Sequence, residues 1–98
     1  MASKSLGERL VFGTTLPREI DGNESVRFLR HLQNIFSDSL VSTSEEPSQG
    51  VMEVRIYRGK PERNSQLVAE ILQILASALI ETIGIAATFN QKSFSMKD

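Results

Sequence analysis

The chain has 98 residues, of which 40% are hydrophobic and 23% charged, and its formal net charge is -1. This length predicts one domain with a modest core, for which a second copy would bury additional apolar surface. The near-neutral charge excludes a strong overall attraction to nucleic acid or anionic membrane, and the absence of cysteine excludes disulfides, thiolate metal sites and a cysteine nucleophile.

The first part of the chain is predicted to form a strand after a polar tail. Residues 1–7 lack an apolar leader segment, so we expect a cytoplasmic protein. β-Branched and aromatic residues favour a strand from Glu8 to Leu16, with a short helix through Leu10 as the alternative. Gly13 marks a possible bulge or bend, and Pro17 ends the segment.

An amphipathic helix is predicted from Glu24 to about Val41. Asp21 and Glu24 have the spacing of a capping box, and Asn23 is an alternative cap. One face repeats apolar residues at steps of three and four, namely Phe28, Leu29, Leu32, Ile35, Phe36 and Leu40.

The middle of the chain is predicted to form a loop and then a strand. The polar composition from Ser42 to Gly50 is typical of a loop. From Val51 to Arg58, apolar and polar residues alternate, which predicts a strand with one buried face. Residues 58–63 then read as a turn.

The last predicted element is a long apolar helix. It begins near Pro61, or at a cap on Asn64 or Ser65, and runs toward Phe89, where Gly84 loosens or ends it. A single polar stripe at helical spacing interrupts its apolar surface, comprising Gln66, Glu70, Gln73, Ser77, Glu81, Gly84 and Thr88. A helix that is apolar around most of its circumference must be buried by other elements on several sides.

Within this helix, polar residues argue against a membrane span. Glu70, Gln73 and Glu81 interrupt the apolar run, and a carboxylate near a bilayer centre costs about 2.5–3.5 kcal/mol. We therefore expect no transmembrane segment.

These elements predict one α+β domain over residues 1–98, in the order β-α-β-α, with polar tails at 1–7 and 90–98. The long C-terminal helix packs on a small sheet. Because a two-stranded sheet is marginal in water, we expect a homodimer to complete the fold.

One segment has a partial resemblance to a known family. Val54–Glu62, followed by apolar residues at helical spacing, resembles the strand, turn and helix of the 4-oxalocrotonate tautomerase family. The chemistry of that family depends on a proline at the mature N-terminus. Here Ala2 follows Met1 and Pro17 is internal, so the resemblance brings no catalytic residue.

The sequence indicates no catalytic residue, metal ligand or cofactor. His31 is the only histidine, and its helix offers only Asp38, two turns away, as a further ligand. The serines at 42, 44 and 48 have no histidine beside them and suit turns. Four cations beside Tyr57 are candidates for anion binding, namely Arg55, Arg58, Lys60 and Arg63.

The leading hypothesis is a non-enzymatic interaction or assembly protein that acts as a homodimer and serves an unidentified protein partner. It self-associates through the long helix and the strand at 51–58. The candidates for its interface, or for the core beneath, are Leu72, Leu75, Leu79, Ile83, Val54 and Ile56. The alternatives are a binder of a lipid-like or other apolar small molecule, and phosphate or nucleic-acid binding through the basic residues at 55–63.

Overall fold

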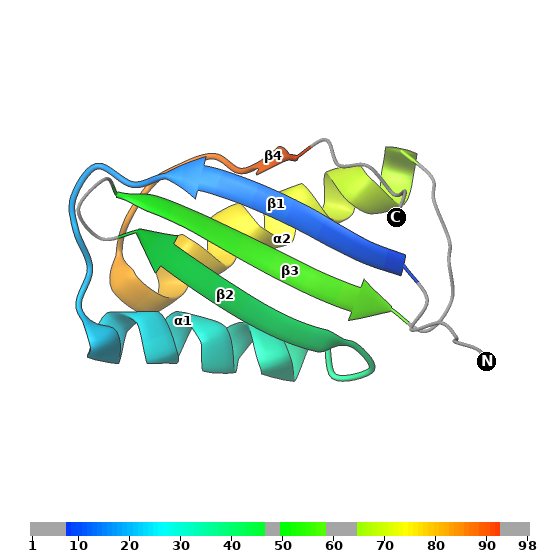
Figure 1. The fold of residues 1–98 in the computed structure, drawn as a ribbon, viewed down its shortest axis with the longest axis horizontal. Coiled ribbons are helices and arrows are strands. Elements are labelled where there is room, and N and C mark those ends of the chain that lie inside the picture. The colour runs from blue at the N-terminus through cyan, green and yellow to red at the C-terminus, as the bar shows by residue number, and fades with distance from the viewer. Residues whose placement is uncertain (1–7, 47–49, 59–64, 93–98) are drawn as a thin grey trace.

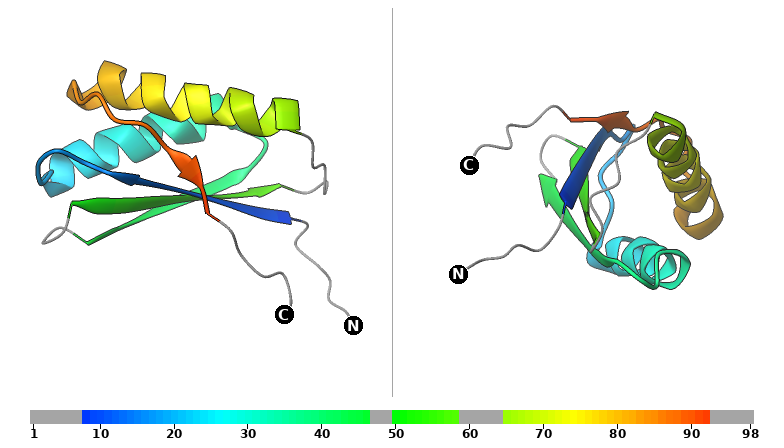
Figure 2. Two further views of the ribbon diagram at one scale, coloured as in Figure 1. Left: turned by 90° about the horizontal axis from the view of Figure 1, so that it is seen from above. Right: turned by 90° about the vertical axis from the view of Figure 1, so that its right-hand side faces the viewer.

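The structure is a computed structural model that describes residues 8–46, 50–58 and 65–92. These residues form β1 (Glu8–Thr15), α1 (Gly22–Ile35), β2 (Leu40–Glu46), β3 (Val51–Arg58), α2 (Ser65–Ile83) and β4 (Asn90–Gln91). The strands make one antiparallel sheet in the order β2-β3-β1-β4. Both helices lie on the same face of this sheet, as Figures 1 and 2 show. The predicted small α+β domain is confirmed, with two strands more than the sequence indicated.

The strand pairing defines the topology. β3 is antiparallel to both β1 and β2, so β1 and β2 run in the same direction with β3 between them. β4 is antiparallel to β1 on the other side. A β-α-β-β-α-β chain with this interleaved sheet has the split β-α-β arrangement, which is also called ferredoxin-like.

The core fills the space between the sheet and the two helices. Alternate strand residues point toward the helices, as Phe12 and its register partner Val54 do, and both are fully buried. The buried cluster comprises Leu10, Phe12, Leu16, Phe28, Leu32, Val41, Met52, Val54, Ile56, Ile71, Leu75, Ala78, Leu79, Ile85 and Phe89.

β1 and β3 match the predicted strands closely. The register is unbroken from Glu8 opposite Arg58 to Thr15 opposite Val51, so the bulge proposed at Gly13 is not present. Instead, the side chain of Lys92 crosses the strand at Gly13, where an added Cβ would lie 2.9 Å from Lys92 Cδ.

β2 corrects the prediction of a loop from Ser42 to Gly50. The strand covers Leu40–Glu46 and pairs with β3 along its length. Val41 is buried on the face toward the helices, and its β-branched side chain suits a strand. Pairing with β3 therefore overrides the polar composition, because a strand with one open face can carry polar residues there. Residues 47–49 lie outside the described part.

α1 confirms the predicted capping box and ends earlier than predicted. The Asp21 carboxylate accepts from the Glu24 N–H at 2.8 Å, and the Glu24 carboxylate accepts from the Asp21 N–H at 3.2 Å. The helix stops at Ile35, and the C-cap Phe36 still donates to the Leu32 carbonyl. The helical spacing of Leu40 is coincidental, since this residue begins β2.

α2 ends at Ile83 rather than running toward Phe89. Gly84 has a φ of +70°, the left-handed conformation that ends many helices, and its N–H donates to the Ile80 carbonyl. The chain then turns back, so that Asn90 and Gln91, predicted as part of a polar tail, form β4. The proposed starts at Pro61 and Asn64 lie outside the described residues.

Candidate functional site

The structure separates the predicted interface or core residues into two groups. Val54, Ile56, Leu75 and Leu79 are fully buried between the sheet and the helices of this chain. Leu72 and Ile83 are half-buried and pack against the same cluster. All six therefore contribute to the core of the single chain. The sequence left open whether they formed this core or an interface.

The polar stripe on α2 faces solvent, as its pattern predicts. Gln66, Glu70, Gln73, Ser77 and Glu81 are all exposed. On the opposite side of the helix, the sheet and α1 supply the cover that was expected from a second copy. By length and composition α2 could also cross a membrane, which is a weak indication because the core helix of a soluble domain has the same properties.

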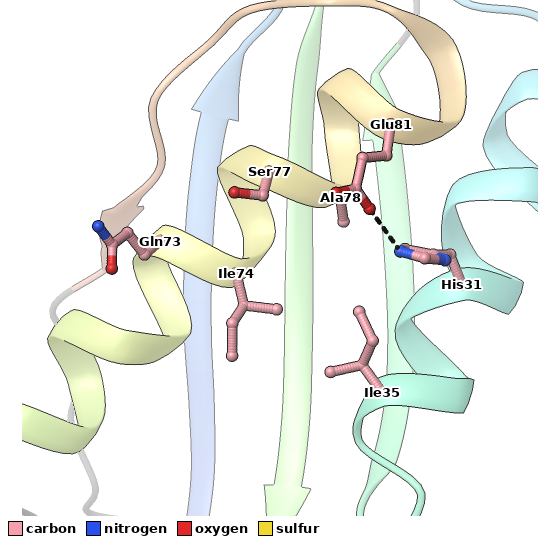
Figure 3. A pocket seen from close by; sticks show the side chains of 7 residues that line it. All are labelled: His31, Ile35, Gln73, Ile74, Ser77, Ala78 and Glu81. Carbon is pink, nitrogen blue, oxygen red and sulfur yellow. Dashed lines mark ion pairs between the residues drawn. The ribbon is translucent and has the colours of Figure 1, made fainter.

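A groove of about 320 Å3 lies between α1 and α2 (Figure 3). Ile35 and Ile74 line it, and His31 Nε2 lies 3.3 Å from Glu81 Oε1 across it. The Ser77 side chain points away from His31, so the groove holds no hydroxyl activated by a base. No sequence pattern predicts this contact, because its two residues are fifty positions apart and share no motif.

A second hollow, of about 510 Å3, lies between α2 and the segment that returns to the sheet. Leu72, Ala76 and Phe89 give it an apolar floor, while Gln66 and Glu70 stand at its side. Both hollows flank the polar stripe on the outer surface of α2. Both are open to solvent.

Of the four predicted anion-binding residues, the structure describes the side chain of Arg55 alone. Arg55 lies on the sheet face away from the helices, where it donates to Ser44 Oγ at 3.0 Å and to Glu53 Oε1 at 3.2 Å. The side chain of Arg58 lies outside what the structure describes, as do Lys60 and Arg63. The structure instead places Lys92 near Arg55, with Lys92 Nζ 3.5 Å from Glu53 Oε2.

The outer side of β2 is the candidate interaction site. β2 stands at the end of the described sheet, so one long side of its backbone pairs with no strand of that sheet. Leu40, at its start, is 71% exposed, the largest value among the described large apolar residues. β3, which the sequence suggested for association, is occupied by β1 and β2 on its two sides and cannot accept another strand.

The surface of α1 beside β2 is also apolar, on the face of the sheet opposite to that of Leu40. Arg27 donates to the Thr82 carbonyl and His31 contacts Glu81. These two contacts identify the side of α1 that faces α2. On a helix with 3.6 residues per turn, Val26 and Leu29 lie on the other side. Val26 is 53% exposed and Leu29 is half-buried. Apolar side chains therefore accompany an open strand edge.

Comparisons with known proteins place the chain in no family. No family model matches it, and no curated protein matches it. The partial resemblance to the tautomerase family therefore has no support from these comparisons. Among the described residues, no group of three or more histidine, aspartate or glutamate side chains is placed to hold a metal ion.

Proposed function

We propose that this chain is a small non-enzymatic assembly protein that forms a homodimer through the outer edge of β2. The supporting observation is the open backbone of a seven-residue end strand beside the exposed Leu40. Unpaired strand edges readily accept another strand, and proteins normally protect them by charge, proline or a cover. Pairing two copies would join their sheets and remove this edge from both.

The sequence of β2 is compatible with antiparallel pairing to itself. In a register centred on Thr43, Ser42 lies opposite Ser44 of the second copy and Val41 lies opposite Glu45. Leu40 then lies opposite Glu46. Thr–Thr and Ser–Ser pairs are favourable across antiparallel strands, whereas like charges placed directly opposite are not. This register sets no carboxylate against another.

The twofold axis of such a dimer would also bring the two α1 helices together. Antiparallel strands that place the same face of each sheet on one side require a twofold axis perpendicular to the sheet. Both α1 helices then lie on the same face, and each turns the side that carries Val26 and Leu29 toward the axis. The apolar surface beside β2 would thus be buried in the dimer, where desolvated apolar anchors contribute most to binding.

The test is the solution mass of three proteins by sedimentation or light scattering. We expect the wild-type chain to have twice the mass of one copy, and Leu40→Lys to have the mass of one copy, because a lysine at a strand edge opposes pairing. Ile80→Lys is the matched control, since Ile80 is 54% exposed on α2, away from β2. This control should remain dimeric.

Two outcomes contradict the proposal. A wild-type chain with the mass of one copy at all accessible concentrations would remove the dimer altogether. Dissociation by Ile80→Lys, but not by Leu40→Lys, would place the interface on the long helix, as the sequence alone suggested.

A further inference from the structure

We propose that the sheet face away from the helices binds single-stranded nucleic acid, through Arg9, Arg55, Lys92 and Tyr57. The four residues lie on β1, β3 and just after β4 rather than on β2, so the proposal does not depend on dimer formation. Neither helix covers it, as the end-on view in Figure 2 shows. Its residues come from β1, from β3 and from the position that follows β4, and are brought together only by the fold.

The strand register gathers these residues in adjoining rows. Arg9 lies opposite Tyr57 across β1 and β3, and Tyr57 lies opposite Leu40 across β3 and β2. In the next row on the same face, Arg55 lies between Val11 and Ser42. Directly paired residues in a sheet have Cβ atoms about 4.5–5.5 Å apart, so Tyr57 has a cation within reach in its own row.

The charge on this face is positive although the chain as a whole is near neutral. Among its described side chains, Arg9, Arg55 and Lys92 are cations and Glu53 is the single carboxylate. Glu53 contacts both Arg55 and Lys92, at 3.2 and 3.5 Å, and so holds two cations side by side. By contrast, α2 carries Glu70 and Glu81 and no cation. This uneven distribution favours a polyanion on the sheet face.

The shape and composition of the face favour a single strand. Duplex grooves accept a helix or a narrow two-stranded ribbon, which a broad sheet face does not resemble. Single-stranded nucleic acid instead uses aromatic side chains as stacking platforms beside a basic track for its phosphates. Tyr57 is half-buried in the sheet, between Arg9 and Leu40 in its own row, and the small Ser42 lies in the next row of β2.

The experiment measures fluorescence anisotropy of a labelled oligouridylate of about twelve nucleotides, a length within the site sizes of such surfaces. With three phosphate contacts, the slope of log affinity against log salt should be about -2. Affinity should therefore fall about 20-fold between about 50 and 200 mM salt. The full-length chain is used throughout, and circular dichroism confirms that each variant is folded.

Five variants, one of them a control, separate the contribution of stacking from that of charge. Arg9→Glu should weaken binding at least about tenfold and make the salt slope shallower by about one or more. Tyr57→Leu should weaken it about five- to tenfold, while Tyr57→Phe keeps the ring and should bind like the wild type. Glu53→Gln should tighten binding, because it removes the one described carboxylate on the face. Arg30→Glu, on the exposed surface of α1, is the control for overall charge.

Several results overturn the proposal. They are the absence of binding at low salt, equal losses in Arg30→Glu and Arg9→Glu, and a preference for duplex over single strand. Binding of polyglutamate as tight as that of oligouridylate, together with no effect of Tyr57→Leu, would assign the face to acidic peptides instead. Loss in Arg9→Glu and Tyr57→Leu, with retention in Tyr57→Phe and Arg30→Glu, supports it.

Discussion

α2 and β2 differ in how completely the rest of the chain buries their apolar side chains and pairs their backbone groups. α2 is rich in apolar residues, yet its inner side is buried on the sheet and its outer side carries the polar stripe. β2 is largely polar, yet it stands at the end of the sheet with one side of its backbone unpaired there. The need for a partner therefore depends on where an element lies in the fold, because unpaired backbone groups create that need as readily as apolar side chains do.

The largest effect should come from a charge on the buried side of α2. Leu79 is fully buried, so Leu79→Asp places a carboxylate in the core without a partner. We expect a loss of about 4 kcal/mol or more, a large share of the stability of a small domain. Circular dichroism and urea unfolding should report a largely unfolded chain.

The adjacent residue provides the control for this comparison. Ile80 is 54% exposed on the same helix, so Ile80→Asp should change the free energy of unfolding by only about 0.5 kcal/mol. A loss comparable to that of Leu79→Asp would mean that the outer side of α2 is also buried, by a surface beyond the described chain.

Local patterns in the sequence predicted much of this fold. The alternation through Met52, Val54 and Ile56 predicted β3, and the spacing of Asp21 and Glu24 predicted the capping box. Both signals depend on residues a few positions apart. The stripe on α2 likewise predicted which residues of that helix face solvent.

The parts that the sequence did not predict depend on distant contacts. β2 has a polar composition and becomes a strand by pairing with β3, while β4 is only two residues long and is defined by its pairing with Phe12 and Gly13. The rows that join Arg9 to Tyr57 arise from strand register, which one sequence does not reveal. For the same reason, the candidate surfaces emerged only from the structure.

The edge of β2 can be tested by cross-linking, because the wild-type chain has no cysteine. In the proposed register Thr43 lies opposite its own copy, at a Cα separation of about 4.5–5.5 Å, which suits a disulfide. Under mild oxidation, Thr43→Cys should form a covalent dimer that non-reducing electrophoresis detects.

Ser42→Cys is the matched control for this register. Its nearest counterpart in the second copy is a diagonal neighbour, at about 7–8 Å, where a disulfide requires backbone movement. Equal cross-linking of both variants would indicate random collision, and cross-linking of Ser42→Cys alone would indicate another register.

A smaller effect is expected where α2 ends. Gly84 has a φ of +70° and open space around its Cα, so Gly84→Ala meets no clash and introduces only backbone strain. The expected loss is about 1 kcal/mol, measured as a lower urea midpoint.

Gly22→Ala is the control for this glycine. Gly22 is the first residue of α1, its φ is not in the left-handed region, and a Cβ would meet nothing within 4 Å. This substitution should raise stability by about 0.4–1 kcal/mol. If both variants were equally stable, the left-handed conformation of Gly84 would not be needed to end α2.

The smallest effect concerns the start of α1, the helix beside the open edge. Arg18 donates to both carboxylate oxygens of Glu24, at 3.0 and 2.9 Å, and this lowers the pKa of Glu24 from 4.5 to about 2, with help from the Asp21 N–H. Because the pKa is lower in the folded chain, the ionised carboxylate stabilises it above about pH 4.5. That stabilisation is lost as the pH falls toward about 2.

Glu24→Gln isolates this contribution, since glutamine can still complete the capping box without the charge. The thermal midpoints of wild type and variant should differ by a small, constant amount above pH 4.5, and converge between pH 4.5 and about 2. Because the pair is exposed, added salt should reduce the difference. A difference that persists unchanged at the lowest pH would show that the side chain acts through its shape and not through its charge.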